Sequence, residues 1–178
     1  MEIRTIETED YAEIKVLIQK AFENEEHSDG DEQLLVERIR KEKSYQKEFE
    51  VIALINSEIV GHGLLSPVII EQKESSIIED AVMALAPLAV KKEYQGKGIG
   101  RAIIAELENR AKTAGYQGLS ILGDPGYYQR FGYFPAKIKQ IEAPFEIESN
   151  YFLIKELTEN SLENCQGIVR YLPAFGLN

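Results

Sequence analysis

The apolar positions near the start of the chain change from a strand period to a helix period. Residues 2–7 form a short β-type run, and Thr8 is suited to cap the following helix, because a threonine side chain can accept a hydrogen bond from the first turn. That helix keeps apolar side chains at helical spacing, at Ile14, Leu17, Ile18 and Phe22. A second helix is predicted over residues 31–41, with Leu34, Leu35, Arg38 and Ile39 in sequence.

The middle of the chain is rich in β-forming residues. Residues 51–70 consist of two such runs joined at Asn56-Ser57, and this arrangement is typical of a β-hairpin. Residues 84–90 form another predicted strand, in which Pro87 lacks the N–H needed for one ladder hydrogen bond. We therefore expect Pro87 at a bulge or where the strand leaves its neighbour.

The second half of the chain alternates helix and strand. A helix is predicted from Ile99 to Gly115, because glycine is a natural residue just beyond a helix C-terminus. Residues 118–123 are predicted as a strand, residues 127–132 as a short helical turn, and residues 151–157 as the last strand. This order predicts a mixed α/β sheet with helices on both faces, in a single domain spanning residues 1–178.

Composition and charge narrow the possible functions. The 178 residues include 20 Lys and Arg against 30 Asp and Glu, a net charge of −10, which argues against nucleic-acid binding. The net charge is weakly consistent with cationic partners, although solubility alone also explains it. No apolar run approaches the length of a membrane helix, and we expect no membrane association. The single Cys165 suits a reducing compartment, so a cytoplasmic protein is expected.

The stretch EYQGKGIGRAII, residues 93–104, is the main chemical signal. Glycines at 96, 98 and 100 open a predicted helix, where backbone N–H groups and the helix dipole favour an anion. Lys91, Lys92, Lys97 and Arg101 add local positive charge to an acidic chain. A purely structural glycine turn is the alternative. The Walker and dinucleotide-binding patterns both fail at their last required positions.

Residues 95–100, QGKGIG, resemble the coenzyme A turn of the GNAT superfamily of N-acetyltransferases. Residues 123–136, GDPGYYQRFGYFPA, resemble that family's later segment, with Tyr128 four residues before Gly132. The resemblance implies a mostly antiparallel sheet splayed at the acyl-CoA site. It also implies transfer of an acetyl group from acetyl-CoA, the co-substrate, to a primary amine by direct attack in a ternary complex, without a metal.

The resemblance also assigns functional roles to individual residues of this sequence. The resemblance places the pantetheine arm beside Leu88, Ala89 and Val90. It places the pyrophosphate on a turn made of Gln95, Gly96, Lys97, Gly98, Ile99, Gly100 and Arg101. Tyr128 becomes the candidate catalytic acid, since a phenol is protonated at neutral pH, with Tyr127 as its easily confused neighbour. Some relatives have a glutamate where this chain has Ala84, so the general base is open; Glu79 and Asp80 lie nearby in sequence, and a water relay is an equal alternative.

The sequence gives its weakest indications for the acceptor site. His62 lies between two glycines, which suggest that something approaches that strand closely. It is a candidate base or substrate contact, or a structural or solvent-facing histidine. Glu32, at the end of the acidic segment 23–32, is the candidate contact for a cationic amine, against the alternative of a solvated surface loop, where His27 also lies. The expected partner is a small-molecule or peptide amine, and the resemblance makes a homodimer plausible. The rival functions are a non-catalytic acyl-CoA sensor and, more weakly, a small nucleotide-binding oxidoreductase.

Overall fold

Two long strands, β3 (Glu58–Glu71) and β4 (Ile77–Val90), run through both of the units into which the chain divides. The computed structural model describes residues 1–23, 28, 30–72 and 76–177, apart from the side chains of Glu79 and Asp80. Unit 1 comprises Met1–Leu65 and Ala86–Arg110, and unit 2 comprises Ser66–Leu85 and Ala111–Asn178.

The sheet of unit 1 is antiparallel. β1 (Glu2–Thr5) pairs with β2 (Glu50–Ile55), and β2 pairs with β3 so that Ile52 lies opposite His62. Asn56 and Ser57 both have positive φ, 51° and 66°, as a two-residue hairpin turn with the right twist requires. The predicted hairpin is confirmed. On the far side of β3, the Lys91 N–H donates to the Val60 carbonyl at 2.9 Å, which joins the end of β4 to this sheet.

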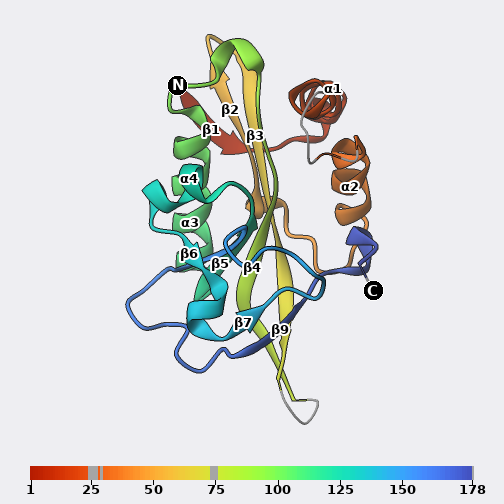
Figure 1. The fold of residues 1–178 in the computed structure, drawn as a ribbon. Helices are drawn as coiled ribbons and strands as arrows, with labels where there is room; N and C mark the ends of the chain where they lie inside the picture. Colours follow the sequence, from red (N-terminus) through yellow and green to blue (C-terminus); the bar gives the residue numbers. More distant parts are fainter. Residues whose placement is uncertain (24–27, 29, 73–75, 178) are drawn as a thin grey trace. The chain divides into compact units, whose positions relative to one another are not determined.

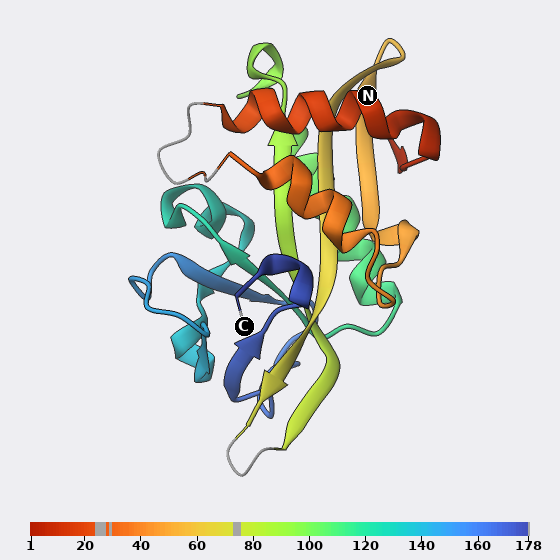
Figure 2. The same cartoon turned by 90° about the vertical axis from the view of Figure 1, so that its right-hand side faces the viewer.

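Helices cover both faces of this sheet (Figures 1 and 2). α1 (Tyr11–Phe22) and α2 (Glu32–Ile39) lie on one face, and α3 (Ile99–Thr113) lies on the other. Short 3-10 turns precede α1 (Thr8–Asp10), β2 (Lys47–Phe49) and the glycine turn (Lys92–Tyr94). α3 ends as predicted, with Gly115 at φ 95° and the Tyr116 N–H donating to the Ala111 carbonyl, so the glycine serves as the helix stop.

One expectation about the first helices was wrong. Thr8 does not cap α1, because the chain first makes a 3-10 turn whose cap is Glu7, in a reciprocal capping box with Asp10. In α2 the buried residues are Gln33, Val36 and Ile39, whereas the Leu34 side chain is 41% exposed. The helix predicted over residues 31–41 is confirmed, one residue shorter at its start and two shorter at its end.

Unit 2 builds its sheet around the other halves of β3 and β4. β5 (Gly118–Leu122) runs parallel to β4, β8 (Phe152–Glu156) is antiparallel to β5, and β6 (Phe134–Pro135) is antiparallel to β8. The predicted helical turn after β5 is present as α4 (Pro125–Tyr128), a 3-10 turn (Gln129–Phe131) and Gly132 at φ 88°.

The strand near 151–157 is not the last one, contrary to prediction. β9 (Gly167–Arg170) pairs antiparallel with β3, and β7 (Ile141–Glu142) pairs parallel with β9. Further 3-10 turns span Ala136–Lys139 and Pro173–Phe175. β9 is four residues long and pairs with Ile69–Glu71, roughly a hundred positions away, so no local pattern announces it.

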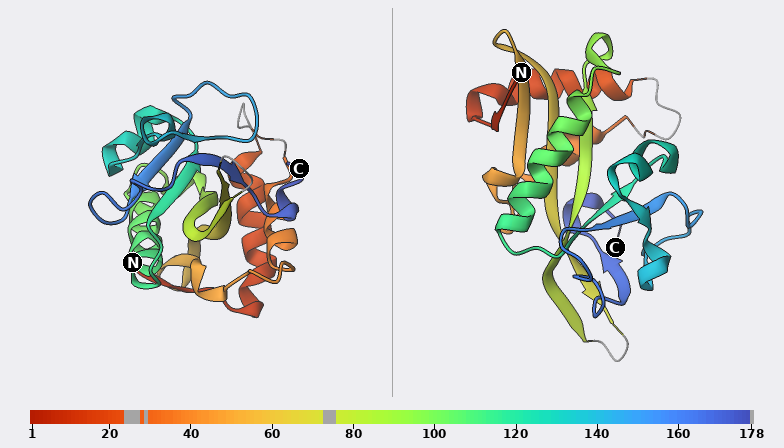
Figure 3. Two further views of the ribbon diagram at one scale, coloured as in Figure 1. Left: turned by 90° about the horizontal axis from the view of Figure 1, so that it is seen from below. Right: turned by 90° about the vertical axis from the view of Figure 1, so that its left-hand side faces the viewer.

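The predicted fold class is confirmed, as a mixed α/β arrangement in which most strand pairs are antiparallel (Figure 3). The core of unit 2 includes Cys165, whose thiol lies 3.1 Å from the Gln117 side-chain oxygen and whose pKa is raised by burial. The thiol thus packs as part of this core. Among the described helices, none combines the length and the apolar character that crossing a bilayer requires.

Candidate functional site

The glycine turn in unit 1 adopts a backbone that favours glycine. Gly96 and Gly98 have φ of 72° and 82°, in the left-handed region that other residues adopt at a cost. A Cβ atom built on either glycine would meet nothing within 4 Å. The requirement at these two positions is therefore conformational, and the space beside the turn is open.

The backbone N–H groups from Gly96 to Arg101 lie where α3 begins. The first hydrogen bond into the helix runs from the Ala102 N–H to the Gly98 carbonyl at 3.1 Å, so the preceding N–H groups lie ahead of the intrahelical ladder. The helix dipole adds about half a positive charge at the same end. The Gln95 side chain donates to the Val90 carbonyl at 3.2 Å and thereby ties the turn to the end of β4.

Three of the four basic residues around the turn remain available. Lys91 is already ion-paired, because its ammonium lies 2.9 Å from Glu58 and 3.6 Å from Glu13. Lys92, Lys97 and Arg101 are exposed and make no ion pair with any residue that the structure describes. The Lys97 ammonium sits 5.1 Å from the centre of the Tyr94 ring. The turn thus combines N–H groups ahead of the helix ladder with exposed cationic side chains.

The strand before the turn leaves its neighbour where the proline predicts. Pairing between β4 and β5 covers Val82 to Leu85, and the following Ala86–Pro87 peptide is cis. Beyond it, Leu88 and Val90 are partly exposed and Ala89 is buried, as expected for side chains alternating across a strand. The expectation for Pro87 is confirmed.

Ala84 lies inside the apolar core of unit 2. It is 2% exposed and belongs to the cluster that includes Val82 and Ile154. A carboxylate at this position would be buried among hydrocarbon side chains, at a high desolvation cost. The side chains of Glu79 and Asp80, the other carboxylates considered for this strand, lie outside the described part of the chain.

Tyr128 stands at the end of α4 in unit 2. Its ring lies edge-on to Tyr127 at 4.9 Å and to Tyr133 at 5.9 Å, and its hydroxyl makes no hydrogen bond with a described residue. Burial, with smaller contributions from Tyr127 and Asp124, raises the pKa of Tyr128 to about 12. The phenol therefore stays protonated at neutral pH, and its O–H remains able to donate a hydrogen bond or a proton.

Gly123 makes room for this tyrosine. A Cβ on Gly123 would lie 2.4 Å from the Tyr128 ring, so only glycine lets the ring pack against the backbone at the end of β5. Tyr127 lies 5.1 Å from Phe131, and the Arg130 guanidinium lies 5.0 Å from its centre. Both tyrosines thus lie in aromatic contacts, and Tyr128 is the more deeply packed of the two against the backbone of β5.

His62 is fully buried in unit 1 and belongs to a polar cluster on the face covered by α1 and α2. Its Nε2 lies 2.7 Å from Oε1 of Glu50. Arg40, the C-cap of α2, donates to both oxygens of the same carboxylate, and the Tyr45 hydroxyl donates to Oε2 at 2.8 Å. The Arg40 guanidinium also stacks 3.8 Å from the centre of the Tyr11 ring. We call these five residues the Glu50 cluster.

The glycines beside His62 explain its orientation. Cβ atoms on Gly61 and Gly63 would lie 2.8 and 2.5 Å from atoms of Ile103, so α3 is what approaches this strand closely. Because side chains alternate across a strand, His62 points to the opposite face, toward Glu50. The expected close approach is confirmed, and His62 is not solvent-facing.

Glu50 is the residue that sequence reasoning missed. Burial acts to raise its pKa, but hydrogen bonds and charge from His62 and Arg40 together outweigh burial and lower the pKa to about 2. A glutamate opening a strand usually lies at the surface. The chain offers a weak signal only, since Arg40 and His62 lie ten and twelve positions away without any periodic relation.

Glu32 opens α2 and is partly buried. Its Oε2 is shielded from solvent and has no hydrogen-bond partner in the described part of the chain, and the same holds for Oε1 of the adjacent Gln33. Two acceptor atoms therefore stand unpaired at this helix end. Much of the acidic segment before it, including His27, lies outside the described residues.

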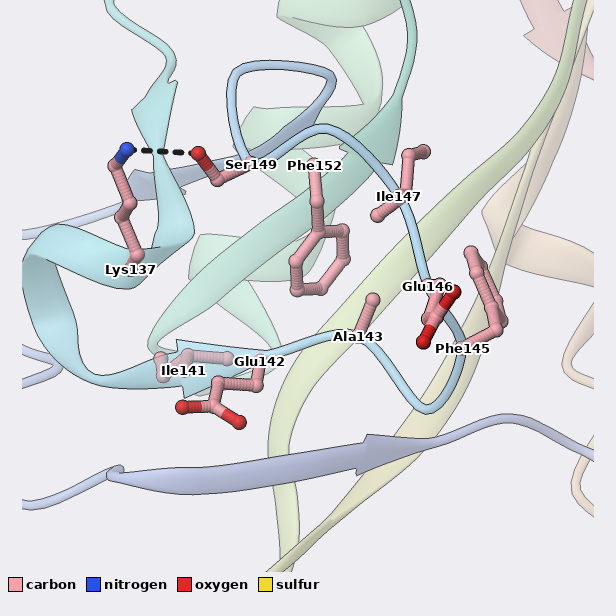
Figure 4. A pocket seen from close by; sticks show the side chains of 9 residues that line it. All are labelled: Lys137, Ile141, Glu142, Ala143, Phe145, Glu146, Ile147, Ser149 and Phe152. Carbon is pink, nitrogen blue, oxygen red and sulfur yellow. Dashed lines mark hydrogen bonds between the residues drawn. The ribbon is translucent and has the colours of Figure 1, made fainter.

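A separate hollow of about 210 Å³ lies in unit 2 (Figure 4). The Lys137 ammonium and the Ser149 hydroxyl, 2.7 Å apart, stand at one side of it, and Phe152 projects into its middle. Its lining contains none of the residues predicted from sequence: Lys137, Ile141, Glu142, Ala143, Phe145, Glu146, Ile147, Ser149 and Phe152. Within the described ranges, no three His, Cys, Asp or Glu side chains gather as metal ligands would.

Known proteins share this sequence pattern. Residues 11–133 match the model of the acetyltransferase (GNAT) family. The uncharacterized N-acetyltransferase YhbS of Escherichia coli K12 is 27% identical over 118 residues, which are 66% of this chain and 68% of that protein. The uncharacterized N-acetyltransferase YjhQ of the same organism is 29% identical over 143 residues, 80% of this chain and 75% of that protein.

Solved structures share the fold. The crystal structure of Escherichia coli YhbS in complex with CoA has a TM-score of 0.86 at 25% identity, over 98% of this chain and 91% of that one. A GNAT family acetyltransferase from Brucella melitensis, in complex with acetyl-CoA, has a TM-score of 0.78 at 29% identity, over 98% and 97% of the two chains. With its glycine turn, its strand order and a family match across most of its length, the chain belongs to the acetyltransferase (GNAT) family.

Proposed function

We propose that the chain transfers an acetyl group from acetyl-CoA to a primary amine, by direct attack within a ternary complex. The observation that carries the proposal is the turn at 95–101. Gly96 and Gly98 have positive φ, the N–H groups precede the α3 ladder, and Lys97 and Arg101 make no ion pair with a described residue. These properties suit the pyrophosphate of coenzyme A. Related structures with the same fold were solved with CoA and with acetyl-CoA.

In this proposal each part of the turn has its own task. The backbone from Gly96 to Arg101 binds the pyrophosphate oxygens, and Lys97 and Arg101 neutralise its charge. Gln95 contributes by fixing the turn to β4 through its bond to Val90, rather than by direct contact. Leu88, Ala89 and Val90 lie along the pantetheine arm, and a backbone N–H of this strand polarises the thioester carbonyl.

Tyr128 supplies the proton that the departing thiolate needs. Its high pKa keeps it in the acid form at neutral pH, and its hydroxyl has no described partner competing for that proton. Positioned acids of this kind contribute roughly 10²- to 10⁴-fold to a rate. Glu32 is the proposed contact for the acceptor, because a shielded carboxylate oxygen without a partner suits the N–H groups of an amine.

The test is thiol release from acetyl-CoA in the presence of a panel of primary amines, run beside a binding titration with CoA. The proposal predicts saturable CoA binding and amine-dependent thiol release with at least one class of amine. CoA binding without turnover by any amine would contradict acetyl transfer. Absence of CoA binding would contradict the proposal entirely.

Tyr128→Phe and Tyr127→Phe form a matched pair for the acid. Each loses one hydroxyl from neighbouring aromatic positions, so general effects on packing are similar. We expect Tyr128→Phe to lower kcat at least about 100-fold with little change in CoA affinity, and Tyr127→Phe to stay near wild type. Equal effects in the two variants would assign the role to neither.

A non-catalytic acyl-CoA sensor is the second candidate. Ala84, buried in the core of unit 2, favours it, because the strand carboxylate that some relatives have is missing here. The free Tyr128 hydroxyl favours the enzyme. A sensor would bind CoA with the same affinity in wild type and in Tyr128→Phe, and neither would release thiol with any amine.

The remaining expectations stay predictions. They are a small-molecule or peptide acceptor, a single folding domain over residues 1–178, a cytoplasmic location and a homodimer. Cooperative unfolding in one transition, and a sedimentation measurement of mass, would test the second and the last of these.

A further inference from the structure

The Glu50 cluster fixes the protonation pattern of His62. Glu50 already accepts hydrogen bonds from Arg40 and Tyr45, and an ionised carboxylate has only acceptors to offer. Its contact with His62 at 2.7 Å therefore requires the proton on Nε2. In the neutral ring this leaves the lone pair on Nδ1, the nitrogen that is free to bind a proton.

That second nitrogen has no partner. Nδ1 of His62 is shielded from solvent and makes no hydrogen bond with any described residue, although the whole side chain is buried. Buried polar atoms in folded proteins are nearly always paired, often by an ordered water. In a catalytic triad a carboxylate likewise holds one imidazole nitrogen, and the other nitrogen accepts the proton of the reacting group.

Stability alone does not account for this cluster. Burying an ion pair costs much of what the pair gains, and well-packed apolar residues at such sites are often equally stable. Glu50 on β2 contacts His62 directly, Arg40 at the end of α2 and Tyr45 in the following loop donate to Glu50, and Tyr11 on α1 stacks on Arg40. Together they hold one nitrogen and leave the other free.

We propose that His62, through Nδ1 and an ordered water, accepts the proton that the acceptor amine releases, and that Glu50 positions it. The inference rests on the proposed acetyl transfer, and it fills the role that the apolar position of Ala84 leaves empty. Arg40 and Tyr45 are positioning residues that hold Glu50.

The proton balance closes with groups already named. The amine nitrogen forms its bond to the acetyl carbon, and its N–H bond breaks as the proton moves through water to Nδ1. The carbon–sulfur bond breaks with its electron pair going to sulfur, which takes a proton from Tyr128. The His62 imidazolium then releases its proton to solvent. The Tyr128 phenolate takes a proton from solvent and returns to its acid form.

The deciding variant is His62→Gln. A glutamine amide can donate to Glu50 much as Nε2 does, so it keeps the structural bond but offers no basic nitrogen. We expect kcat to fall at least about 100-fold, CoA affinity to stay within about twofold, and the thermal midpoint to change little. The acid limb of the wild-type pH profile of kcat/KM should disappear. Lys15→Gln, which removes the exposed ion pair with Glu37 between α1 and α2, is the control for this part of the fold.

Retention of wild-type kcat and of the same pH profile in His62→Gln would overturn the proposal and leave His62 a structural residue. If that variant does not fold, ¹⁵N NMR of the wild-type imidazole decides, since the proposal requires a proton on Nε2 and none on Nδ1 in the neutral ring. A proton on Nδ1 would overturn it. A wild-type protein that binds CoA but acetylates no amine would contradict the proposed function itself, and this inference with it.

Discussion

Residues 61–63 and residues 96–98 are both a glycine, a nitrogen-bearing side chain and a second glycine, and both lie in unit 1. In the first segment a Cβ on either glycine would collide with Ile103 of α3, and the central His62 is completely buried. In the second segment a Cβ would meet nothing, φ is positive at both glycines, and the central Lys97 is exposed. The same residue pattern thus meets a packing requirement in a strand and a backbone requirement at the turn proposed to bind CoA.

The largest expected effect comes from adding one methyl group to each segment. In Gly63→Ala the new Cβ would lie 2.5 Å from Ile103 and 3.0 Å from Leu107, and we expect about 2–3 kcal/mol less free energy of unfolding. In Gly98→Ala only the positive φ is strained, at a cost of about 1 kcal/mol. Chemical denaturation of the two variants measures the difference. Equal losses of unfolding free energy in the two variants would contradict the view that Gly63 is required by steric contact and Gly98 only by its backbone conformation.

A second prediction concerns the buried segment through pH. The pKa of Glu50 is lowered from 4.5 to about 2, so its contribution to stability is complete above pH 4.5 and is lost as pH falls toward 2. We expect about 2 kcal/mol of the free energy of unfolding to be lost between about pH 6 and pH 3 from this group. Denaturation across that range, compared with Glu50→Gln, isolates it. If the unfolding free energy of Glu50→Gln depends on pH as that of the wild type does, the carboxylate that contacts His62 is not an ionised Glu50.

The third prediction concerns the exposed turn. Gly98→Asp combines backbone strain with a negative charge beside the proposed pyrophosphate, so CoA affinity should fall at least about tenfold. Gly176→Asp is the matched control, because Gly176 also has a positive φ, 68°, and open space around its Cβ position. Calorimetric titration measures both. If Gly98→Asp binds CoA as the control does, the turn is not the site.

The smallest expected effect belongs to the central lysine of the turn. Lys97→Ala should weaken CoA binding about threefold at low salt and less at high salt, since exposed charges are screened. Stability should stay the same, because Lys97 makes no ion pair with a described residue. Titration at two ionic strengths checks this. A salt-independent loss would mean that Lys97 acts through the Tyr94 ring rather than through charge.

Local chemistry made much of the fold predictable. The Asn56-Ser57 turn, the glycine stop at Gly115 and the turn around Gly132 each follow from a backbone preference of the residue itself. The start of α1 was not predictable in this way, because Glu7 and Asp10 competed successfully with Thr8 for the cap. The shortest strands, such as β9, depend on partners far away in the chain.

The candidate site likewise has one part that is local in sequence and one part that is brought together from distant segments. The turn at 95–101 is contiguous, so its glycines and cations reveal it directly. The Glu50 cluster draws on two helices, a loop and two strands, and nothing in the spacing of its members indicates that they meet. Glycines 61 and 63 suggested a close approach to the strand, but not that His62 would turn away from it toward a carboxylate.

Backbone NMR during a titration with CoA tests the comparison most directly, because it reads the amides of both segments in one wild-type sample. We expect saturable chemical-shift changes that are largest from Gly96 to Arg101 and small at Gly61 and Gly63. Saturable changes that leave the amides of 96–101 unmoved, or no saturable change anywhere, would contradict this expectation.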